Sequence, residues 1–113
     1  MPITGAALVP SPESCVAQLA RFFPAATHVR IPVRLSRIGA DEGSEQTVIE
    51  FGTPQEVLFA CAHPLEFADR IRLQNSDGSL DVEAQVVAVQ YRNGKTAVAA
   101  RFAREVANWI VKL

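Results

Sequence analysis

Two arginines spaced four residues apart are the side chains in this sequence best suited to hold an anionic ligand. They lie in the run Arg30-Ile31-Pro32-Val33-Arg34. A guanidinium group is always charged and presents a planar fork that matches phosphate oxygens or the O6 and N7 acceptors of guanine. These arginines also alternate with apolar residues, which is the pattern of a solvated outer strand face. The strand-face interpretation is favoured, and the ligand interpretation stays open.

A second group of reactive residue types is Cys61-Ala62-His63. A Cys-x-His pair on a strand points both side chains to one face, but zinc needs one or two more ligands. Cys15 and His28 are the remaining residues of that kind, and both are distant in sequence. A nucleophile and its base also need an orienting group and an oxyanion hole, which no local motif supplies. We therefore expect a buried cysteine beside a loop histidine, no metal site and no enzyme.

The composition indicates one folded domain. The chain has 113 residues, of which 49% are hydrophobic and 20% charged, with a net charge of −1. Nucleic acid and anionic membranes normally require a clustered positive surface, so neither is expected as the main partner. Two cysteines in different segments do not predict a disulfide scaffold. With no long apolar run and no basic start typical of a signal peptide, we expect a cytoplasmic protein without membrane insertion.

A short helix is predicted near the start of the chain. Residues 1–10 are interpreted as a tail and residues 11–23 as the helix, with Ser11 as N-cap and Pro12 at the first helical position. A helix of two to three turns is marginal by itself. We therefore expect it to dock either on the rest of the domain or on another copy of the chain, which leaves a homo-oligomer open.

Alternation of apolar and polar residues predicts a series of strands after the helix. Their ranges are 29–35, 46–51, 57–61, 70–74, 80–92 and 96–102. Pro32 places the first strand at a sheet edge or at a bulge, and a bulge is expected near Val86 in the longest one. Asn93-Gly94 predicts a tight hairpin. A short C-terminal helix is expected after Phe102.

The same alternation selects the residues of the core. Buried side chains are expected at Val57, Phe59, Ile71, Leu73, Val98 and Phe102, with Trp109 closing one end. The arginines at 70 and 72 fall on the outer strand face, where they are expected to be solvated. With Arg30, Arg34 and Arg101 they would alternatively form a basic patch.

The order of these strands resembles that of the PilZ family, small bacterial barrels that bind cyclic di-GMP. The resemblance covers about residues 29–112 and rests on the order of the motifs, above all Val57-Leu58-Phe59, the Pro64 to Asp69 connector and Ala97 to Phe102. It implies a mainly β fold, a six-stranded antiparallel barrel of split-barrel type over residues 27–113, with a short helix at each end.

The resemblance also implies where a ligand would bind. Family members that bind cyclic di-GMP carry Arg-x-x-x-Arg ahead of the barrel and Asp/Asn-x-Ser-x-x-Gly after an early strand. Arg30 and Arg34 match the first motif, with Thr53 and Arg101 nearby as further candidates. The second motif falls either on Phe51, Thr53 and Glu56 or, one residue earlier, on Glu50, Gly52 and Gln55. Neither register gives the family pattern, and an acidic residue there would repel an anionic ligand.

Three interpretations of function stay open, and the first two follow from the resemblance. The first is a PilZ-like signalling domain with weakened or lost nucleotide binding that acts by binding a protein partner. The second is a functional cyclic di-GMP receptor that uses Arg30 and Arg34. The third is a generic SH3-like adaptor barrel. None of them requires a cofactor.

Overall fold

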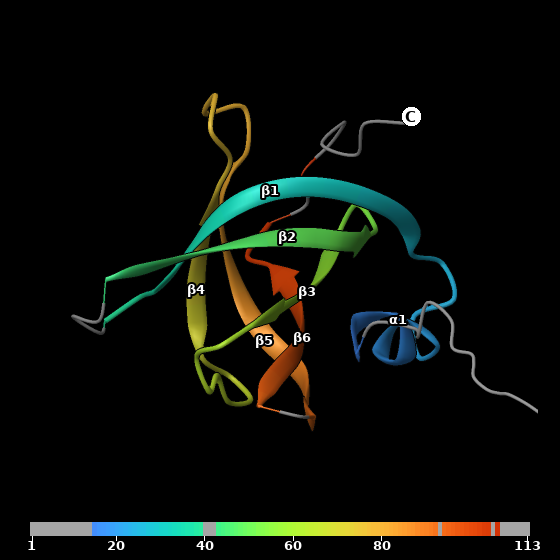
Figure 1. The fold of residues 1–113 in the computed structure, drawn as a ribbon. Coiled ribbons are helices and arrows are strands. Elements are labelled where there is room, and N and C mark those ends of the chain that lie inside the picture. The colour runs from blue at the N-terminus through green and yellow to red at the C-terminus, as the bar shows by residue number, and fades with distance from the viewer. Residues whose placement is uncertain (1–14, 40–42, 93, 105, 107–113) are drawn as a thin grey trace, which may run out of the picture.

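The computed structural model describes residues 15–39, 43–92, 94–104 and 106. Six strands close an antiparallel barrel in the order β1-β2-β3-β6-β5-β4 (Figure 1), so the predicted fold class is confirmed. The elements are α1 (Cys15–Ala20), β1 (Thr27–Arg37), β2 (Ser44–Gly52), β3 (Glu56–Cys61), β4 (Arg70–Gln74), β5 (Asp81–Arg92) and β6 (Lys95–Phe102). The predicted tail and C-terminal helix, including Trp109, lie outside the described residues.

The inside of the barrel is filled by the inward side chains of all six strands. The six residues predicted for this core (Val57, Phe59, Ile71, Leu73, Val98 and Phe102) are all buried there, so that prediction is confirmed. Alternation explains their position, since successive residues of a strand point to opposite faces. Leu65, in the connector between β3 and β4, also belongs to this core.

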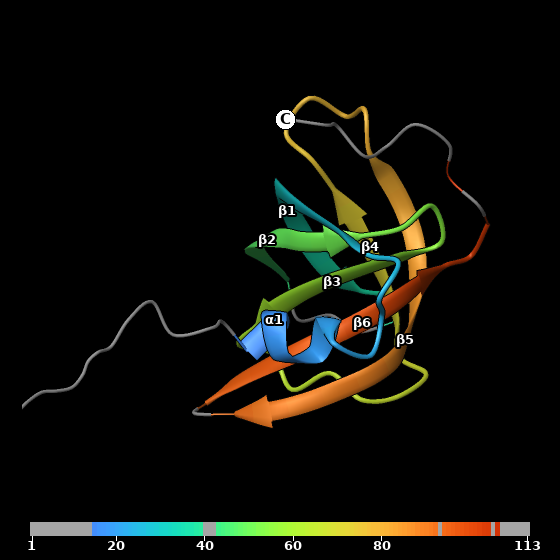
Figure 2. The ribbon, with the colours of Figure 1, turned by 90° about the vertical axis from the view of Figure 1, so that its right-hand side faces the viewer.

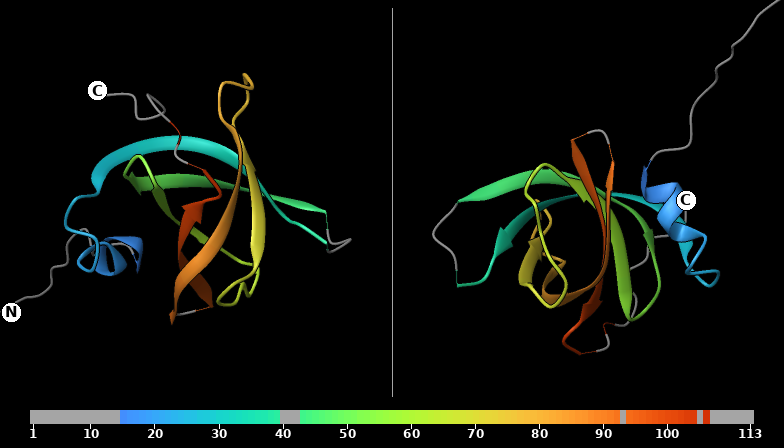
Figure 3. Two further views of the ribbon diagram at one scale, coloured as in Figure 1. Left: turned by 180° about the vertical axis from the view of Figure 1, so that it is seen from behind. Right: turned by 90° about the horizontal axis from the view of Figure 1, so that it is seen from below.

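A second apolar cluster lies outside the barrel wall, beneath α1. Leu58 on β3 and Ala97 and Ala99 on β6 point outward and are buried by Val16 and Leu19 of the helix. Figures 2 and 3 show α1 outside the barrel, and in Figure 2 it lies across β3 and β6. The small outward side chains of β6 fit this close approach, since alanine adds little bulk between the strand and the helix. The predicted docking of the helix on the domain is therefore what the structure shows.

The helix is shorter than the predicted range of residues 11–23. Within the described part it ends at Ala20, and residues 11–14 lie outside that part. The next amides turn back by three residues, with Arg21 N donating to Gln18 O and Phe22 N to Leu19 O at 3.3 and 3.0 Å. This tighter turn satisfies the last carbonyl groups before Pro24, which the apolar spacing alone did not reveal.

β1 combines a bulge with a partly free edge. Its register against β2 shifts between His28 and Ile31, so that Val29 and Arg30 together oppose Glu50. Its pairing with β4 begins only at Arg34. Among the described residues, no strand pairs with Thr27–Val33 on the side away from β2, and we call this side the free edge of β1. Pro32 lies within it, as predicted, since proline cannot donate to a ladder.

β5 contains the other predicted irregularity. Its register against β6 shifts between Val86 and Ala88, which confirms the bulge expected near Val86. No helix among the described residues has the length and apolar character needed to cross a membrane.

Candidate functional site

The two arginines singled out by their spacing lie on the outward face of β1. Arg30 and Arg34 are both exposed, because Val29 and Val33 take the inward positions and are 2% exposed. Among the described residues, neither arginine side chain has an ion pair. The predicted outer strand face is thus what the structure contains, and both guanidinium groups are accessible from solvent.

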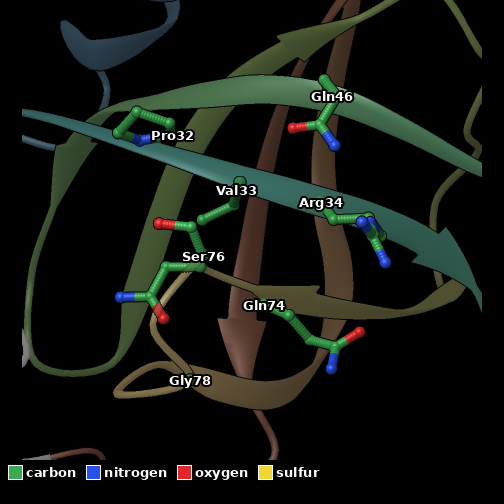
Figure 4. Close-up of a pocket in the computed structure, with 8 residues that line it drawn as sticks. Pro32, Val33, Arg34, Gln46, Gln74, Ser76 and Gly78 are labelled. Atoms are coloured by element: carbon green, nitrogen blue, oxygen red, sulfur yellow. The ribbon is translucent and has the colours of Figure 1, made fainter.

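Arg34 lies at the centre of a polar cross-strand row. It is directly opposite Gln46 on β2 and Gln74 on β4. Figure 4 shows the two glutamines on either side of it. Cross-strand neighbours are about 5 Å apart, within reach of long side chains. The sequence alone could not show that these glutamines flank Arg34, because that depends on strand order.

A cleft of about 350 Å³ lies over this row and is called the β1 cleft. Strand residues Arg34, Gln46 and Gln74 line it together with Asn75, Ser76 and Gly78 of the β4–β5 turn. The turn is held closed, since the Asn75 carboxamide accepts from Leu80 N at 3.0 Å and donates to Ser79 Oγ at 2.7 Å. Gly78 has a φ of +78°, a left-handed conformation that glycine adopts without steric cost.

Thr53 and Arg101 lie at a different place, where β2 turns into β3. The Thr53 hydroxyl accepts hydrogen bonds from Gln55 N at 3.1 Å and Glu56 N at 2.9 Å, and the residue is only 6% exposed. Glu56 in turn accepts a hydrogen bond from Arg101 at 2.8 Å. Thr53 therefore serves the turn, and the Arg101 guanidinium is engaged by a carboxylate.

Thr53 lies toward the opposite end of β2 from the residue that pairs with Arg34. Gly52, the residue before Thr53, pairs with Thr27, whereas Gln46 pairs with Arg34. The six residues from Gln46 to Gly52 span roughly 20 Å along the strand. The candidates are thus spread along β1 and β2, with Arg30 opposite Glu50 toward the Thr53 end and Arg34 opposite Gln46 toward the other end.

Three further outward arginines of the strands are matched by carboxylates. Arg70 pairs with Glu83, Arg72 with Asp81 and Arg101 with Glu56. The Arg72 pair is bidentate, with both distances at 2.8 Å. This hydrogen bonding to Arg72 lowers the pKa of Asp81. The basic patch considered from the sequence is therefore neutralised along β4, β5 and β6.

A second cleft of about 400 Å³ lies among these neutralised arginines. Arg70, Gln85 and Arg101 form a continuous row across β4, β5 and β6 on its floor. Glu83 is also part of its lining, and Glu56 continues the row on β3. Its charges are thus balanced within the protein, unlike that of Arg34 in the β1 cleft.

The Cys61 thiol and the His63 ring each contact other groups of the fold. The Cys61 thiol donates to His63 O at 3.2 Å, and burial raises its pKa to about 12. Nucleophilic attack requires the thiolate, so this cysteine is inert at neutral pH. Within the described ranges, no group of three or more potential metal ligands is found.

His63 is instead part of a structural contact with Glu45. The Glu45 carboxylate accepts from Ala62 N at 2.7 Å and from His63 N at 3.2 Å, and lies 3.1 Å from His63 Nδ1. Burial alone would raise the pKa of Glu45, but the hydrogen bonds outweigh this effect and the pKa is lowered. The contact anchors the residues that follow β3 to the start of β2.

No protein-family model and no curated protein matches this sequence. Among solved structures, the chain is similar to the Inhibitor of motility of Bacillus subtilis (MotI/DgrA), with 14% sequence identity and a TM-score of 0.54. The similarity covers 73% of this chain and 42% of that one, so the chain matches less than half of the length of that protein. At this identity the similarity shows a shared fold and assigns no function to single residues.

Proposed function

We propose that this chain is a PilZ-like signalling domain that has lost cyclic di-GMP binding and acts by binding a protein partner. Its barrel and its similarity to a protein named for inhibiting motility support a signalling role. The observation that carries the proposal is the ion pair between Glu56 and Arg101. In the first of the two registers, Glu56 stands where the family motif has glycine, and it engages an arginine that was a candidate for the ligand.

The electrostatics of this position oppose an anionic nucleotide. The Glu56 side chain is only 15% exposed, so its charge is weakly screened by solvent. A ligand phosphate placed beside it would be repelled, and it would also have to displace the carboxylate from Arg101. Thr53 offers little compensation, because its hydroxyl is buried and bonded within the turn.

Isothermal titration calorimetry with cyclic di-GMP tests the proposal. We expect no binding heat for the wild-type chain at ligand concentrations well above the micromolar range. The same titration of the double variant Arg30→Ala/Arg34→Ala is the reference. Low-micromolar binding that disappears in the double variant would overturn the proposal and identify a receptor.

One observation favours the receptor alternative. The side chains of Arg30 and Arg34 are exposed and have no carboxylate partner among the described residues, so they are free to bind an anion. A receptor of this kind would use the outward face of β1, with Arg34 in the β1 cleft, rather than the turn at Thr53. Calorimetry on Arg34→Ala alone, compared with Thr53→Ala, distinguishes these two places.

A further inference from the structure

The outward arginines of this barrel fall into two classes. Those on β4 and β6 (Arg70, Arg72 and Arg101) each meet a carboxylate on the neighbouring strand. Arg30 and Arg34 on β1 form no ion pair with any described residue, although Glu50 lies opposite the bulge at Val29 and Arg30 and the chain as a whole carries a net charge of −1. The fold therefore leaves two positive charges uncompensated on one strand. An anionic partner would form there the kind of ion pair that the other arginines form with carboxylates of the protein.

The two uncompensated charges are spaced for an extended polypeptide. Arg30 lies in the bulge and Arg34 in the regular part of β1, and both side chains are exposed. Four residues of extended strand place them roughly 13 Å apart. An extended chain repeats its side chains on one face every second residue with the same rise. Acidic residues at positions i and i+4 of an extended segment would thus match both arginines.

The surroundings of Arg34 suit a carboxylate better than an apolar side chain. Arg34 lies between Gln46 and Gln74, and all three residues line the β1 cleft (Figure 4). A carboxylate there can accept a bidentate pair from the arginine and further hydrogen bonds from the two amides. The free edge of β1 ends at Val33, just before Arg34 pairs with β4. It offers backbone groups to an extended chain that runs toward Arg34, although Pro32 has no N–H to contribute.

We propose that an extended acidic segment of a partner protein binds along β1, with two carboxylates four residues apart on Arg30 and Arg34. This inference rests on the proposed function, because it names the chemistry of the protein partner. Two arginines over one strand give too small a positive surface for nucleic acid, which is bound through many phosphates. A strand-like acidic peptide needs only the two charges and the adjacent edge.

Fluorescence anisotropy with a designed peptide tests the proposal on the full chain. The probe is a fluorescein-labelled ten-residue peptide with blocked ends, made of threonine and serine with glutamate at positions three and seven. Threonine favours the extended conformation. The comparison peptide has the second glutamate at position six, which points to the opposite face of an extended chain. We expect clear binding of the first peptide, weaker binding of the second, and loss of binding at high salt.

Two variants with the same change in net charge locate the site. Arg34→Gln is expected to weaken peptide binding about tenfold, which corresponds to the loss of one charged hydrogen-bonded pair. Arg101→Gln is the matched control and should leave binding unchanged, since its guanidinium is already held by Glu56. Equal losses of peptide binding in the two variants, or equal binding of the two peptides, would show that binding depends only on overall charge. Either result would overturn the proposal.

A competition arm separates this inference from the proposed function. Adding cyclic di-GMP to the complex should not displace the peptide. Displacement would contradict the proposed function, because it would show a working nucleotide site on β1. Absence of peptide binding, together with no calorimetric signal for cyclic di-GMP, would overturn the acidic-segment inference alone. Tighter binding of a fluorescein-labelled single-stranded oligonucleotide than of the peptide would also overturn it.

Discussion

The outward faces of β1 and of β3 with β6 belong to one barrel but carry opposite kinds of side chain. On β3 and β6, Leu58, Ala97 and Ala99 are fully buried beneath α1. On β1, the outward residues Arg30, Pro32 and Arg34 are exposed. The first face contributes to stability through burial of apolar surface. The second contributes little to the fold, which leaves it available to a partner.

Arg101 and Arg34 show how the two regions differ at the level of single side chains. Arg101 lies on the covered side of the barrel, at the end of β6, and is held by Glu56. Arg34 has the same chemistry, but its cross-strand neighbours are glutamines instead of carboxylates. The difference between the two regions is therefore one of neighbours. A residue becomes a candidate for binding when the fold supplies no partner for it.

The largest effect is expected for Leu58→Ala, on the covered face. Leu58 is completely buried between β3 and α1, so truncation should lower the free energy of unfolding by about 2–5 kcal/mol. Urea denaturation followed by circular dichroism measures this loss, with Ile71→Ala in the inner core as the benchmark. A loss far below that of Ile71→Ala would show that the helix does not form a second core.

A smaller effect is expected from the ion pair at the end of β6. The Arg101 side chain is 60% exposed, so its coupling to Glu56 should contribute at most about 1 kcal/mol to stability. A double-mutant cycle of Arg101→Gln and Glu56→Gln, followed by urea denaturation, measures that coupling. A coupling of zero would remove the distinction drawn between this arginine and those of β1.

The third prediction concerns pH and the pair of Arg72 with Asp81. Because Arg72 lowers the pKa of Asp81 in the folded chain, the stabilisation is present above the usual aspartate pKa. It is lost as the pH falls through the folded pKa. An NMR titration should show the Asp81 carboxyl titrating below its ordinary range in the wild type and returning toward it in Arg72→Gln. An unchanged Asp81 titration in Arg72→Gln would contradict the assigned cause.

The smallest effect on stability is expected for Arg30→Gln/Arg34→Gln. Both side chains are exposed and unpaired within the described part of the chain, so the free energy of unfolding should change by no more than about 0.5 kcal/mol. Urea denaturation beside the wild type is the measurement. A substantial loss of stability would mean that these arginines stabilise the fold. The outward face of β1 would then resemble that of β3 and β6.

Much of the local structure could be predicted from residue patterns. The range of β4 matches residues 70–74, and β5 and β6 are joined at Asn93-Gly94, with Arg92 paired to Lys95. The bulge near Val86 was predicted as well. These features depend on alternation and turn chemistry within a few residues, so the sequence carries them directly. The end of α1 was not predicted, because the turn after Ala20 has no strong local signal.

For the site, the sequence by itself determined which residue types were available and which face of a strand each one occupies. Arg30 and Arg34 were identified by their spacing, and their outward direction followed from alternation. Only the tertiary structure decided their neighbours. Gln46 and Gln74 flank Arg34, while Glu56 meets Arg101 across 45 residues of sequence. The physical reason is that cross-strand contacts are set by strand order and register, which arise from the closure of the whole barrel.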